Sequence, residues 1–418
     1  MGSPLHFQIL QSCHTSRARL GRVTTPHGTF DTPAFMPVGT RGTIKGLTPD
    51  QIESTGSQII LNNAYHLMLR PGDELVSRRG GVHRFMRWSG PILTDSGGYQ
   101  AYSMADINSI DDEGVTFTSI IDGSKVHLGP ERAMQVQNNL GADIIMAFDD
   151  CPPSVDPVTL NESRKRLAAS RSARSRRGYD HALRLQQANE RTIRWLERCV
   201  KAHVRPHDQA LFGIVQGGTD LELRRASAEG VCNIELPGYA IGGVAVGEGP
   251  DLIRQVTEFT APLLPAEKPR YLMGVGYERD IVAAVRAGVD MFDCVLPTRN
   301  GRNANVFTRS GRLHLRNAKY REDDTAIEPG CDCLACVGGG GGFSRAYLRH
   351  LFNCGEMLGP ILASIHNIRH FQRLMLDIRQ AIRDDAWSSF HRSWPVLAAA
   401  DDRQAASGGE GDQLFQDT

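Results

Sequence analysis

Three cysteines stand close together towards the C-terminal end of the sequence, at Cys331, Cys333 and Cys336. Thiolates at this spacing can be gathered by one ion, and zinc takes Cys sulfur and His nitrogen in a closed tetrahedral shell. We therefore expect one structural zinc per chain, with a downstream histidine as its fourth ligand. The candidates are His350, His366, His370 and His391. Their spacing does not choose among them.

Polar residues and paired glycines follow several short apolar runs of the chain. They are Asp95, Ser96, Gly97, Gly98, Asp149, Asp150, Gln216, Gly217, Gly218, Gly242, Gly243 and Asp293. A single glycine pair would be explained by a tight turn. Three pairs beside polar residues favour a binding site instead, because glycine lets backbone N–H groups approach a ligand.

Eight apolar runs, with helical patterns between most of them, must position these groups. The runs are Ala34–Val38, Gln58–Asn62, Pro91–Thr94, Asp143–Phe148, Leu211–Val215, Tyr239–Val246, Arg270–Val275 and Val289–Val295. They lack polar alternation, as expected for strands of a parallel sheet that are buried on both faces. We therefore predict an α/β protein built on a (β/α)8 TIM barrel, in which side chains from different strands converge at the C-terminal face.

The barrel pattern stops near Arg309, ahead of the cysteines and a five-glycine run. We predict three parts: a catalytic barrel over residues 1–308, a zinc-binding subdomain with closing helices over 309–395, and a tail over 396–418. The tail is polar and low in complexity, so we expect it to be disordered.

The composition is that of a soluble globular protein, since 40% of the 418 residues are hydrophobic, 22% are charged, and the formal net charge is zero. No apolar run approaches the roughly 20 residues needed to cross a bilayer. Cysteines in a metal-type cluster fit a reducing compartment, so we expect a cytoplasmic protein. Residues 161–201 hold twelve Lys and Arg against four Asp and Glu. Such a stretch is typical of either a phosphate-facing surface or a solvated helix.

Five motifs together resemble one family. They are TDSGGYQ at 94–100, FDDC at 148–151, GIVQG at 213–217, YLMGVG at 271–276 and DMFDCVLPTR at 290–299. With the zinc pattern they resemble the tRNA-guanine transglycosylases (queuine tRNA-ribosyltransferases) of the bacterial type. The resemblance implies a homodimeric pentosyltransferase of queuosine biosynthesis. It would exchange the wobble guanine of GUN-anticodon tRNAs, those for Asp, Asn, His and Tyr, for 7-aminomethyl-7-deazaguanine.

The resemblance also implies roles for individual residues. Breaking an N-glycosidic bond requires a carboxylate nucleophile and a second acid/base group. Asp293 would be the nucleophile that forms the covalent RNA intermediate, and Asp95 the general acid/base. The base would be bound by Ser96, Gly97, Gly98, Tyr99, Asp149, Gln216, Gly243 and Met273. RNA would be contacted by Gly274, Val275, Gly276, Tyr277, Glu278, Arg279 and Asp280, and by Thr298, Arg299, Asn300, Gly301 and Arg302. Among the four histidines, His366 matches the zinc ligand of the family.

The choice of inserted base is expected to depend on the segment after Gly242–Gly243. Val244 stands where bacterial members usually have Leu, and Val246 where the eukaryotic type has Gly. This segment is expected to continue the strand, so a branched side chain at Val246 would fill the space that the added ring of queuine needs.

Two other classes of function remain as alternatives. A catalytically silent RNA-binding subunit is disfavoured because both carboxylates and the zinc cysteines are present. A metal-dependent barrel hydrolase is disfavoured because no histidine pair stands at a strand end with the carboxylates.

Overall fold

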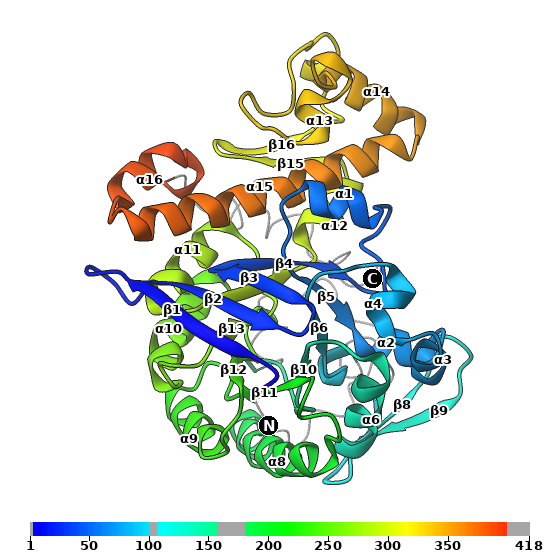
Figure 1. Cartoon of the computed structure of the whole chain (residues 1–418), viewed down its shortest axis with the longest axis vertical. Helices are drawn as coiled ribbons and strands as arrows, with labels where there is room; N and C mark the ends of the chain where they lie inside the picture. The colour runs from blue at the N-terminus through cyan, green and yellow to red at the C-terminus, as the bar shows by residue number, and fades with distance from the viewer. Residues whose placement is uncertain (1–2, 101–106, 157–179, 399–418) are drawn as a thin grey trace.

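The computed structural model describes residues 3–100, 107–156 and 180–398. Eight parallel strands close into a barrel in the order β10-β11-β12-β13-β14-β4-β5-β6 (Figure 1). The strands are β4 (Ala34–Gly39), β5 (Ile60–Asn63), β6 (Ile92–Asp95), β10 (Ile144–Met146), β11 (Ala210–Val215), β12 (Gly238–Ile241), β13 (Arg270–Leu272) and β14 (Met291–Cys294). Each lies within or overlaps one of the expected apolar runs. The predicted barrel is therefore confirmed.

Several strands end earlier than expected, and β12 is one of them. The sequence predicts a strand over Tyr239–Val246, but β12 ends at Ile241. Gly243 has a left-handed backbone with φ 61°, and Ala245 follows with φ 59°. The carboxylate of Glu248 then accepts the N–H groups of Ala245, at 2.5 Å, and Val246, at 3.0 Å. The expectation that Val246 lies on a strand is therefore wrong, because these residues form a loop closed by Glu248.

Helices surround the barrel. They are α1 (Pro49–Ser54), α2 (Ala64–Leu69), α3 (Asp73–Arg78), α4 (Gly81–Met86), α6 (Pro130–Leu140), α8 (His181–Ala202), α9 (Leu221–Cys232), α10 (Pro250–Thr260), α11 (Glu278–Ala287) and α12 (Leu296–Arg302). None of the described helices is both long and apolar enough to span a membrane.

Two small antiparallel sheets were not anticipated. One consists of β1 (His6–Ser12), β2 (Arg19–Thr25) and β3 (Gly28–Thr32), and the other of β7 (Ile107–Ile110), β8 (Val115–Thr118) and β9 (Lys125–Leu128). Val23 of β2 and Phe30 of β3 join the same buried cluster as barrel residues such as Met36 and Phe212. The first sheet therefore contributes to the core of the barrel.

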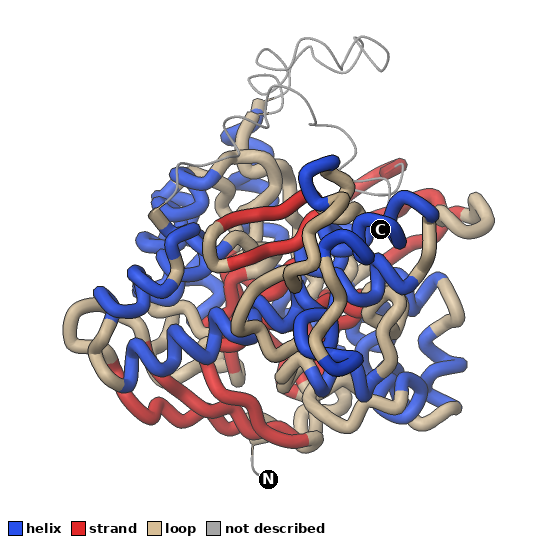
Figure 2. Tube along the Cα trace, turned by 90° about the horizontal axis from the view of Figure 1, so that it is seen from above, coloured by secondary structure: helices blue, strands red, loops and turns tan. Residues whose placement is uncertain are grey.

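The C-terminal elements form the top of the molecule in Figure 1, and Figure 2 looks down on them. They are β15 (Asn305–Thr308), β16 (Gly311–His314), α13 (Leu334–Val337), α14 (Arg345–Cys354), α15 (Leu358–Arg383) and α16 (Trp387–Ser393). Strands β15 and β16 form an antiparallel pair. The first of them ends at Thr308, the residue at which the sequence places the end of the barrel. Of the expected tail, residues 399–418 lie outside the described residues.

Helix α15 connects this unit to the barrel. Gln372 donates to Phe35 O at 3.0 Å and Arg379 donates to Pro33 O at 2.7 Å, both at the start of β4. A Cβ at Gly301 of α12 would lie only 2.8 Å from Ser364 N, so glycine lets α12 and α15 touch closely. The long helix is thus in direct contact with two parts of the barrel.

Helix α8 contains the described part of the basic stretch, and residues 161–179 lie outside the described residues. Its arginines pair with carboxylates of the protein: Arg184 and Arg191 bind Asp150, at 2.5 and 2.6 Å, and Arg198 binds Glu131 at 2.7 Å. The described arginines of this helix therefore tie it to the barrel and to the β7–β9 sheet, where Arg194 binds Asp112 at 2.7 Å.

Candidate active site

The polar strand ends meet at one edge of the barrel. Asp95 is the last residue of β6, Asp149 follows β10, and Gln216 follows β11. Asp293 is the penultimate residue of β14, which ends at Cys294. Gln216 Nε2 donates to Asp149 Oδ2 at 2.6 Å, although the two residues are 67 positions apart. The convergence expected from the strand-end positions is thus present.

Asp293 is held by neutral donors that both bind one of its oxygens. Oδ1 accepts the Tyr271 hydroxyl at 2.6 Å and the Gly274 N–H at 2.8 Å. Burial raises the pKa of Asp293, and these two hydrogen bonds act in the opposite direction. Since Oδ1 receives both donors, Oδ2 is the oxygen that is available for attack on an electrophile.

Asp95 is buried, and the donors that it receives from the described residues are also neutral. Its carboxylate accepts Ala64 N at 2.8 Å, Gln100 Nε2 at 2.8 Å and the side-chain amide of Asn63. Burial raises the pKa of Asp95 to about 7 although these hydrogen bonds lower it, and the charge of Asp293 adds to the rise. A carboxyl group that titrates near neutral pH can both donate and accept a proton.

Asp149 forms the centre of a buried polar cluster, which we call the base pocket because the expected base-binding residues gather around it. Its oxygens accept Ser96 Oγ at 3.0 Å and Gln216 Nε2 at 2.6 Å, and burial raises its pKa to about 6. A Cβ at Gly98 would lie 2.7 Å from Asp149 O, and a Cβ at Gly243 would lie 2.3 Å from Gln216 Oε1. The backbone contact at Gly98 and the left-handed φ of 61° at Gly243 favour glycine at these two positions, so backbone lines the pocket there.

Other expected base-binding residues surround this pocket. Gly97 has φ 79° and lies against Tyr65, where a Cβ would be 3.1 Å from the tyrosine Cβ. Tyr99 and Met273 are half-buried. The structure therefore brings all the expected base-binding residues to the same edge of the barrel as Asp95 and Asp293.

The three cysteines and His366 form a buried cluster that could hold a metal ion. His366 Nδ1 lies 3.7 Å from Cys331 Sγ, 3.5 Å from Cys333 Sγ and 3.4 Å from Cys336 Sγ. Tetrahedral zinc with ordinary bond lengths would separate sulfur and nitrogen ligands by about 3.6 Å. His366 Nε2 donates to Phe307 O at 2.7 Å, which turns the Nδ1 lone pair towards the thiolates.

Comparison with known proteins identifies the family. The profile described as "Queuine tRNA-ribosyltransferase" matches residues 13–182 and 177–396. A queuine tRNA-ribosyltransferase of Geobacillus kaustophilus is 47% identical over 394 residues, which are 94% of this chain and 96% of that protein. The enzyme of Streptococcus suis is 49% identical over 391 residues, with the same coverage of 94% and 96%. This chain belongs to the queuine tRNA-ribosyltransferase family. The resemblance drawn from the five motifs is confirmed, and both relatives are bacterial.

The residues expected to contact RNA in this queuine tRNA-ribosyltransferase lie in two environments. Gly274 is exposed, and Tyr277, Arg279, Asp280, Arg299, Asn300 and Arg302 are half-buried. Val275, Gly276, Glu278, Thr298 and Gly301 are buried. The carboxylate of Glu278 faces His370 of α15, with 2.8 Å between Oε1 and Nε2. Five of the twelve residues therefore face the protein interior.

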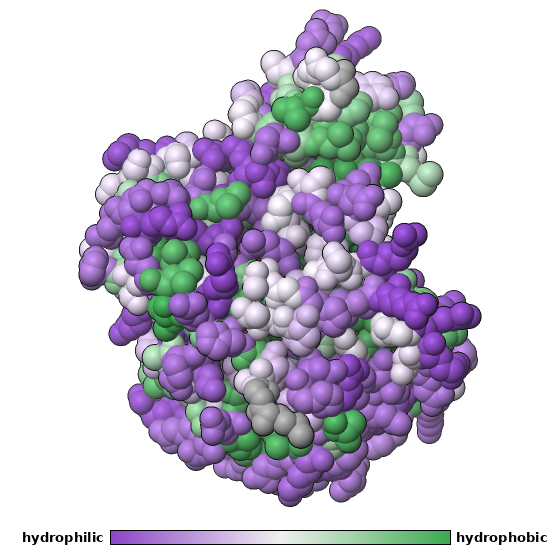
Figure 3. Space-filling view, in the orientation of Figure 1, coloured by the Kyte–Doolittle hydropathy of each residue, from purple (hydrophilic) through white to green (hydrophobic). Residues whose placement is uncertain are grey.

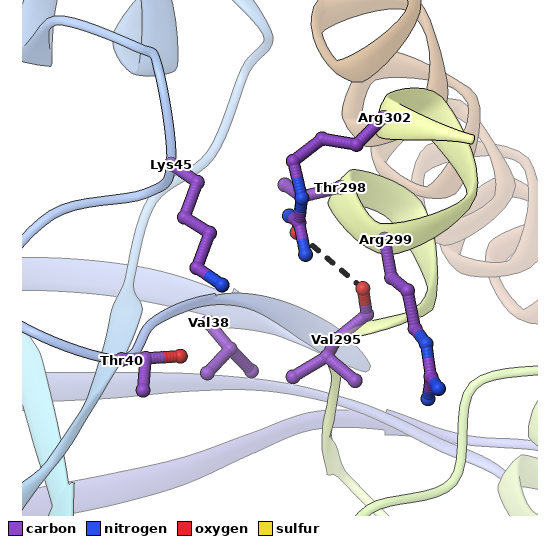
Figure 4. A pocket seen from close by; sticks show the side chains of 7 residues that line it. All are labelled: Val38, Thr40, Lys45, Val295, Thr298, Arg299 and Arg302. Atoms are coloured by element: carbon purple, nitrogen blue, oxygen red, sulfur yellow. Dashed lines mark hydrogen bonds between the residues drawn. The ribbon is translucent and has the colours of Figure 1, made fainter. Parts of the chain in front are cut away.

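A cationic pocket lies beside the second of these stretches. It is lined by Val38, Thr40, Lys45, Val295, Thr298, Arg299 and Arg302 (Figure 4). Lys45 and Arg302 approach it from opposite sides, from the loop after β4 and from α12. Three cationic side chains around one hollow favour an anion such as a phosphate.

Sequence reasoning missed several residues of this site in the queuine tRNA-ribosyltransferase. Asn63 and Gln100 bind Asp95, and Tyr271 binds Asp293. Two signals were available in the sequence: Gln100 and Tyr271 both lie within the family motifs. Asn63 carried no such signal, and Lys45 is remote in sequence from the stretch that it faces.

A second group of metal-type ligands, His27, His83 and Asp143, lies at the opposite edge of the barrel. The two imidazole rings are stacked, with centroids 3.5 Å apart and planes inclined by 13°. An ion between parallel planes would lie far outside the plane of each ring, whereas a nitrogen lone pair lies in the plane. The stacking therefore argues against one ion shared by both histidines.

Proposed function

We propose that this protein is a tRNA-guanine transglycosylase, a pentosyltransferase that exchanges the wobble guanine of tRNA for 7-aminomethyl-7-deazaguanine in queuosine biosynthesis. The observation that carries the proposal is the pair Asp95 and Asp293 beside the Asp149–Gln216 pocket. Among the described residues, both hydrogen bonds to Asp293 go to Oδ1 and none to Oδ2, and burial raises the pKa of Asp95 to about 7.

In this mechanism Asp293 Oδ2 attacks C1′ of the ribose. The C1′–N9 bond breaks, and its electron pair stays on the departing guanine, which takes a proton from Asp95. The incoming base then gives its N9 proton to Asp95 and attacks C1′, and the bond between C1′ and Asp293 breaks. One carboxyl group acts first as acid and then as base, which a pKa near 7 favours.

The pocket would recognise the guanine edge. Ionised Asp149 accepts the N1–H and the 2-amino group, while Gln216 and the Gly243 N–H donate to O6. Tyr99 and Met273 would cover the faces of a base taken out of its stack, together with the backbone of Ser96, Gly97 and Gly98.

The tRNA would be bound through residues 274–280 and 298–302. We propose that the cationic pocket with Lys45 receives a phosphate of the anticodon loop. The substrates would be the GUN-anticodon tRNAs for Asp, Asn, His and Tyr. Free cysteines throughout the chain are compatible with work in the reducing cytoplasm.

The Cys331, Cys333, Cys336 and His366 cluster would hold one zinc with a structural role, because four protein ligands leave no open position. This metal defines the proposed subdomain over 309–395, beside the barrel over 1–308. Elemental analysis should find about one zinc per chain, and Cys333→Ser should lose it together with thermal stability. A zinc-free protein with unchanged melting would contradict this assignment.

A homodimer is supported by an apolar surface on the C-terminal unit. Figure 3 has hydrophobic residues gathered at the top of the molecule, over α13 and α14. The exposed apolar side chains here are Leu334, Val337, Tyr347, Met357 and Leu358. An apolar patch of this kind marks a contact surface. Sedimentation of wild type and of Tyr347→Glu should give a dimer and a weakened dimer, and a wild-type monomer would contradict the proposal.

A base-exchange assay tests the function as a whole. The enzyme should incorporate labelled guanine into a GUN-anticodon tRNA and lose it on addition of 7-aminomethyl-7-deazaguanine. Val246 is half-buried in the loop that follows Gly242 and Gly243, and we still expect its branched side chain to make queuine compete poorly. Failure to incorporate guanine would refute the function, whereas strong competition by queuine would refute only the base preference.

A further inference from the structure

Arg224 is a completely buried cation next to the base pocket. It lies in the first turn of α9, and its guanidinium donates to four backbone carbonyls. Nε binds Gly218 O at 2.8 Å, Nη1 binds Val215 O at 3.0 Å and Gly242 O at 2.7 Å, and Nη2 binds Gly243 O at 2.9 Å. Arg224 is not among the expected catalytic, base-binding, RNA-binding or metal-binding residues.

The four carbonyls belong to two neighbouring strand ends. Val215 and Gly218 follow β11, and Gly242 and Gly243 follow β12. No carboxylate forms an ion pair with Arg224 in the part of the chain that the structure describes. Since guanidinium is a rigid planar fork, four acceptors around it are fixed in direction relative to one another.

The local sequence explains how Arg224 reaches this position. Asp220 caps α9 by accepting Glu222 N at 2.9 Å and Leu223 N at 3.0 Å. Gly217, with φ 128°, approaches so closely that a Cβ there would lie 2.8 Å from Arg224 N. The glycine pair after β11 therefore turns the chain back and brings the start of α9 beneath both strand ends.

The contact with Gly242 O determines where the next N–H points. The peptide between Gly242 and Gly243 is trans, and in a trans peptide C=O and N–H point in opposite directions. Because Gly242 O points at Arg224, the Gly243 N–H points away from it. In the described part of the chain this N–H has no hydrogen-bond partner, and Gln216 Oε1 lies 2.3 Å from where a Cβ at residue 243 would stand.

We propose that Arg224 is a positioning residue that sets base specificity by aiming the Gly243 N–H at O6 of the purine. The inference rests on the proposed function, since it takes guanine as the ligand of the pocket. Arg224 itself does not contact the base. It acts through the backbone carbonyls that it holds.

The test compares purines that differ at one position. 6-Thioguanine replaces O6 by sulfur, a poorer acceptor, and keeps N1–H and the 2-amino group. Hypoxanthine keeps O6 and lacks the 2-amino group that Asp149 would bind. Each purine is measured as a competitor of labelled guanine for incorporation into tRNA, with the wild type and with Arg224→Lys, Arg224→Met and the control Arg254→Met. Arg254 is an exposed arginine of α10.

We expect the wild type to favour guanine over 6-thioguanine by about tenfold or more, the value of one well-aimed hydrogen bond. In Arg224→Lys this ratio should shrink to about threefold or less, while the guanine-to-hypoxanthine ratio stays unchanged. Arg224→Lys keeps the charge and most of the volume, so it remains informative if Arg224→Met does not fold.

An equal loss of both ratios would mean that Arg224 only supports the structure, and an unchanged 6-thioguanine ratio would mean that it does not aim the N–H. Either result overturns the proposal. Failure of the proposed function is distinguishable, because the wild type would then not incorporate guanine at all.

Discussion

Buried carboxylates lie at both ends of the barrel strands, and the groups that bind them differ between the two ends. At the N-terminal end, Asp290 directly precedes β14 and binds Arg19 through two contacts, of 2.8 and 2.6 Å. Asp143 directly precedes β10 and contacts His27 at 2.8 Å and His83 at 3.0 Å. Burial raises the pKa of Asp143, but the hydrogen bonds from His83 and Ile92 N outweigh it, and the pKa is lowered.

At the C-terminal end, Asp95, Asp149 and Asp293 receive amide, hydroxyl and backbone donors, and within the described residues no lysine or arginine forms an ion pair with them. Burial raises the pKa of all three. It also raises the pKa of Asp290 despite the Arg19 pair, so the two ends differ in the partners of their carboxylates and not uniformly in the direction of the pKa. At the N-terminal end of the barrel, an arginine or histidine side chain compensates each of these carboxylates. Among the described residues, the three carboxylates at the C-terminal end form no ion pair, and we call them uncompensated. The first arrangement stabilises the fold, and the second keeps carboxyl groups reactive at neutral pH.

The largest effect is expected for Asp293→Asn at the uncompensated end. An amide of the same shape keeps the packing but cannot attack C1′, so base exchange should fall on the order of a thousandfold or more. The measurement is a denaturing gel of enzyme with tRNA and a base that arrests turnover, beside a tRNA-binding assay as control. A covalent RNA adduct in the variant would identify another nucleophile.

Substitutions at the N-terminal end of the barrel should change the free energy of unfolding and leave catalysis unchanged. Arg19→Met leaves Asp290 buried without its cation and should lower the free energy of unfolding by about 3–5 kcal/mol, with exchange activity retained wherever the protein is folded. Denaturant unfolding measures this. Arg22→Met, on the same strand, removes the half-exposed pair with Asp31 and should cost less than about 1 kcal/mol. Equal losses in the two variants would contradict the distinction between the ends.

The pH dependence of base binding sharpens the comparison. Burial raises the pKa of Asp149 to about 6, and the guanine edge offers donors that require the ionised carboxylate. Activity as kcat/KM for the free base should therefore fall about tenfold per pH unit below pH 6. A profile that stays flat from pH 7 to pH 5 would mean that the protonated form binds equally well.

The smallest effect is expected for Asp95→Asn, measured as stability. The pKa of Asp95 in the folded protein, about 7, lies above the ordinary value of 3.8. The contribution of this group to the free energy of unfolding therefore falls as the pH rises from 3.8 to about 7. Asn63 and Gln100 are amides that can turn to suit an asparagine. At pH 8 the variant should gain about 1 kcal/mol over the wild type, and below pH 4 the gain should vanish. Destabilisation at pH 8 would place Asp95 with the compensated carboxylates.

The sequence indicated which strand-end residues would lie together, but not their hydrogen-bond partners. Asp95 and Asp149 follow apolar runs whose parallel arrangement alone brings their ends together. Asn63 binds Asp95 because β5 and β6 place these two residues opposite each other, and that register is a property of the closed barrel. Arg224 resembles an ordinary surface arginine in a helical pattern, and only the return of the chain after Gly217 buries it.

The strand boundaries had a similar limit. An apolar run such as Tyr239–Val246 does not reveal where pairing stops, since Glu248 rather than a neighbouring strand binds the N–H groups of Ala245 and Val246. The β1–β3 sheet was missed although Arg19–Thr25 alternates buried and exposed positions in its second half. Its contribution depends on Val23, which lies in the barrel core, and a contact of this kind is set by the tertiary fold.

Helix α15 has a consequence for the order in which the chain can fold. Its residues Gln372 and Arg379 bind carbonyls at the start of β4, and Asn367 binds Pro297 O at 2.9 Å, at the start of α12. A growing chain that ends before residue 358 therefore contains all eight barrel strands without these hydrogen bonds. These hydrogen bonds form only when the last part of the chain has left the ribosome, so a shortened chain that carries the barrel alone lacks them.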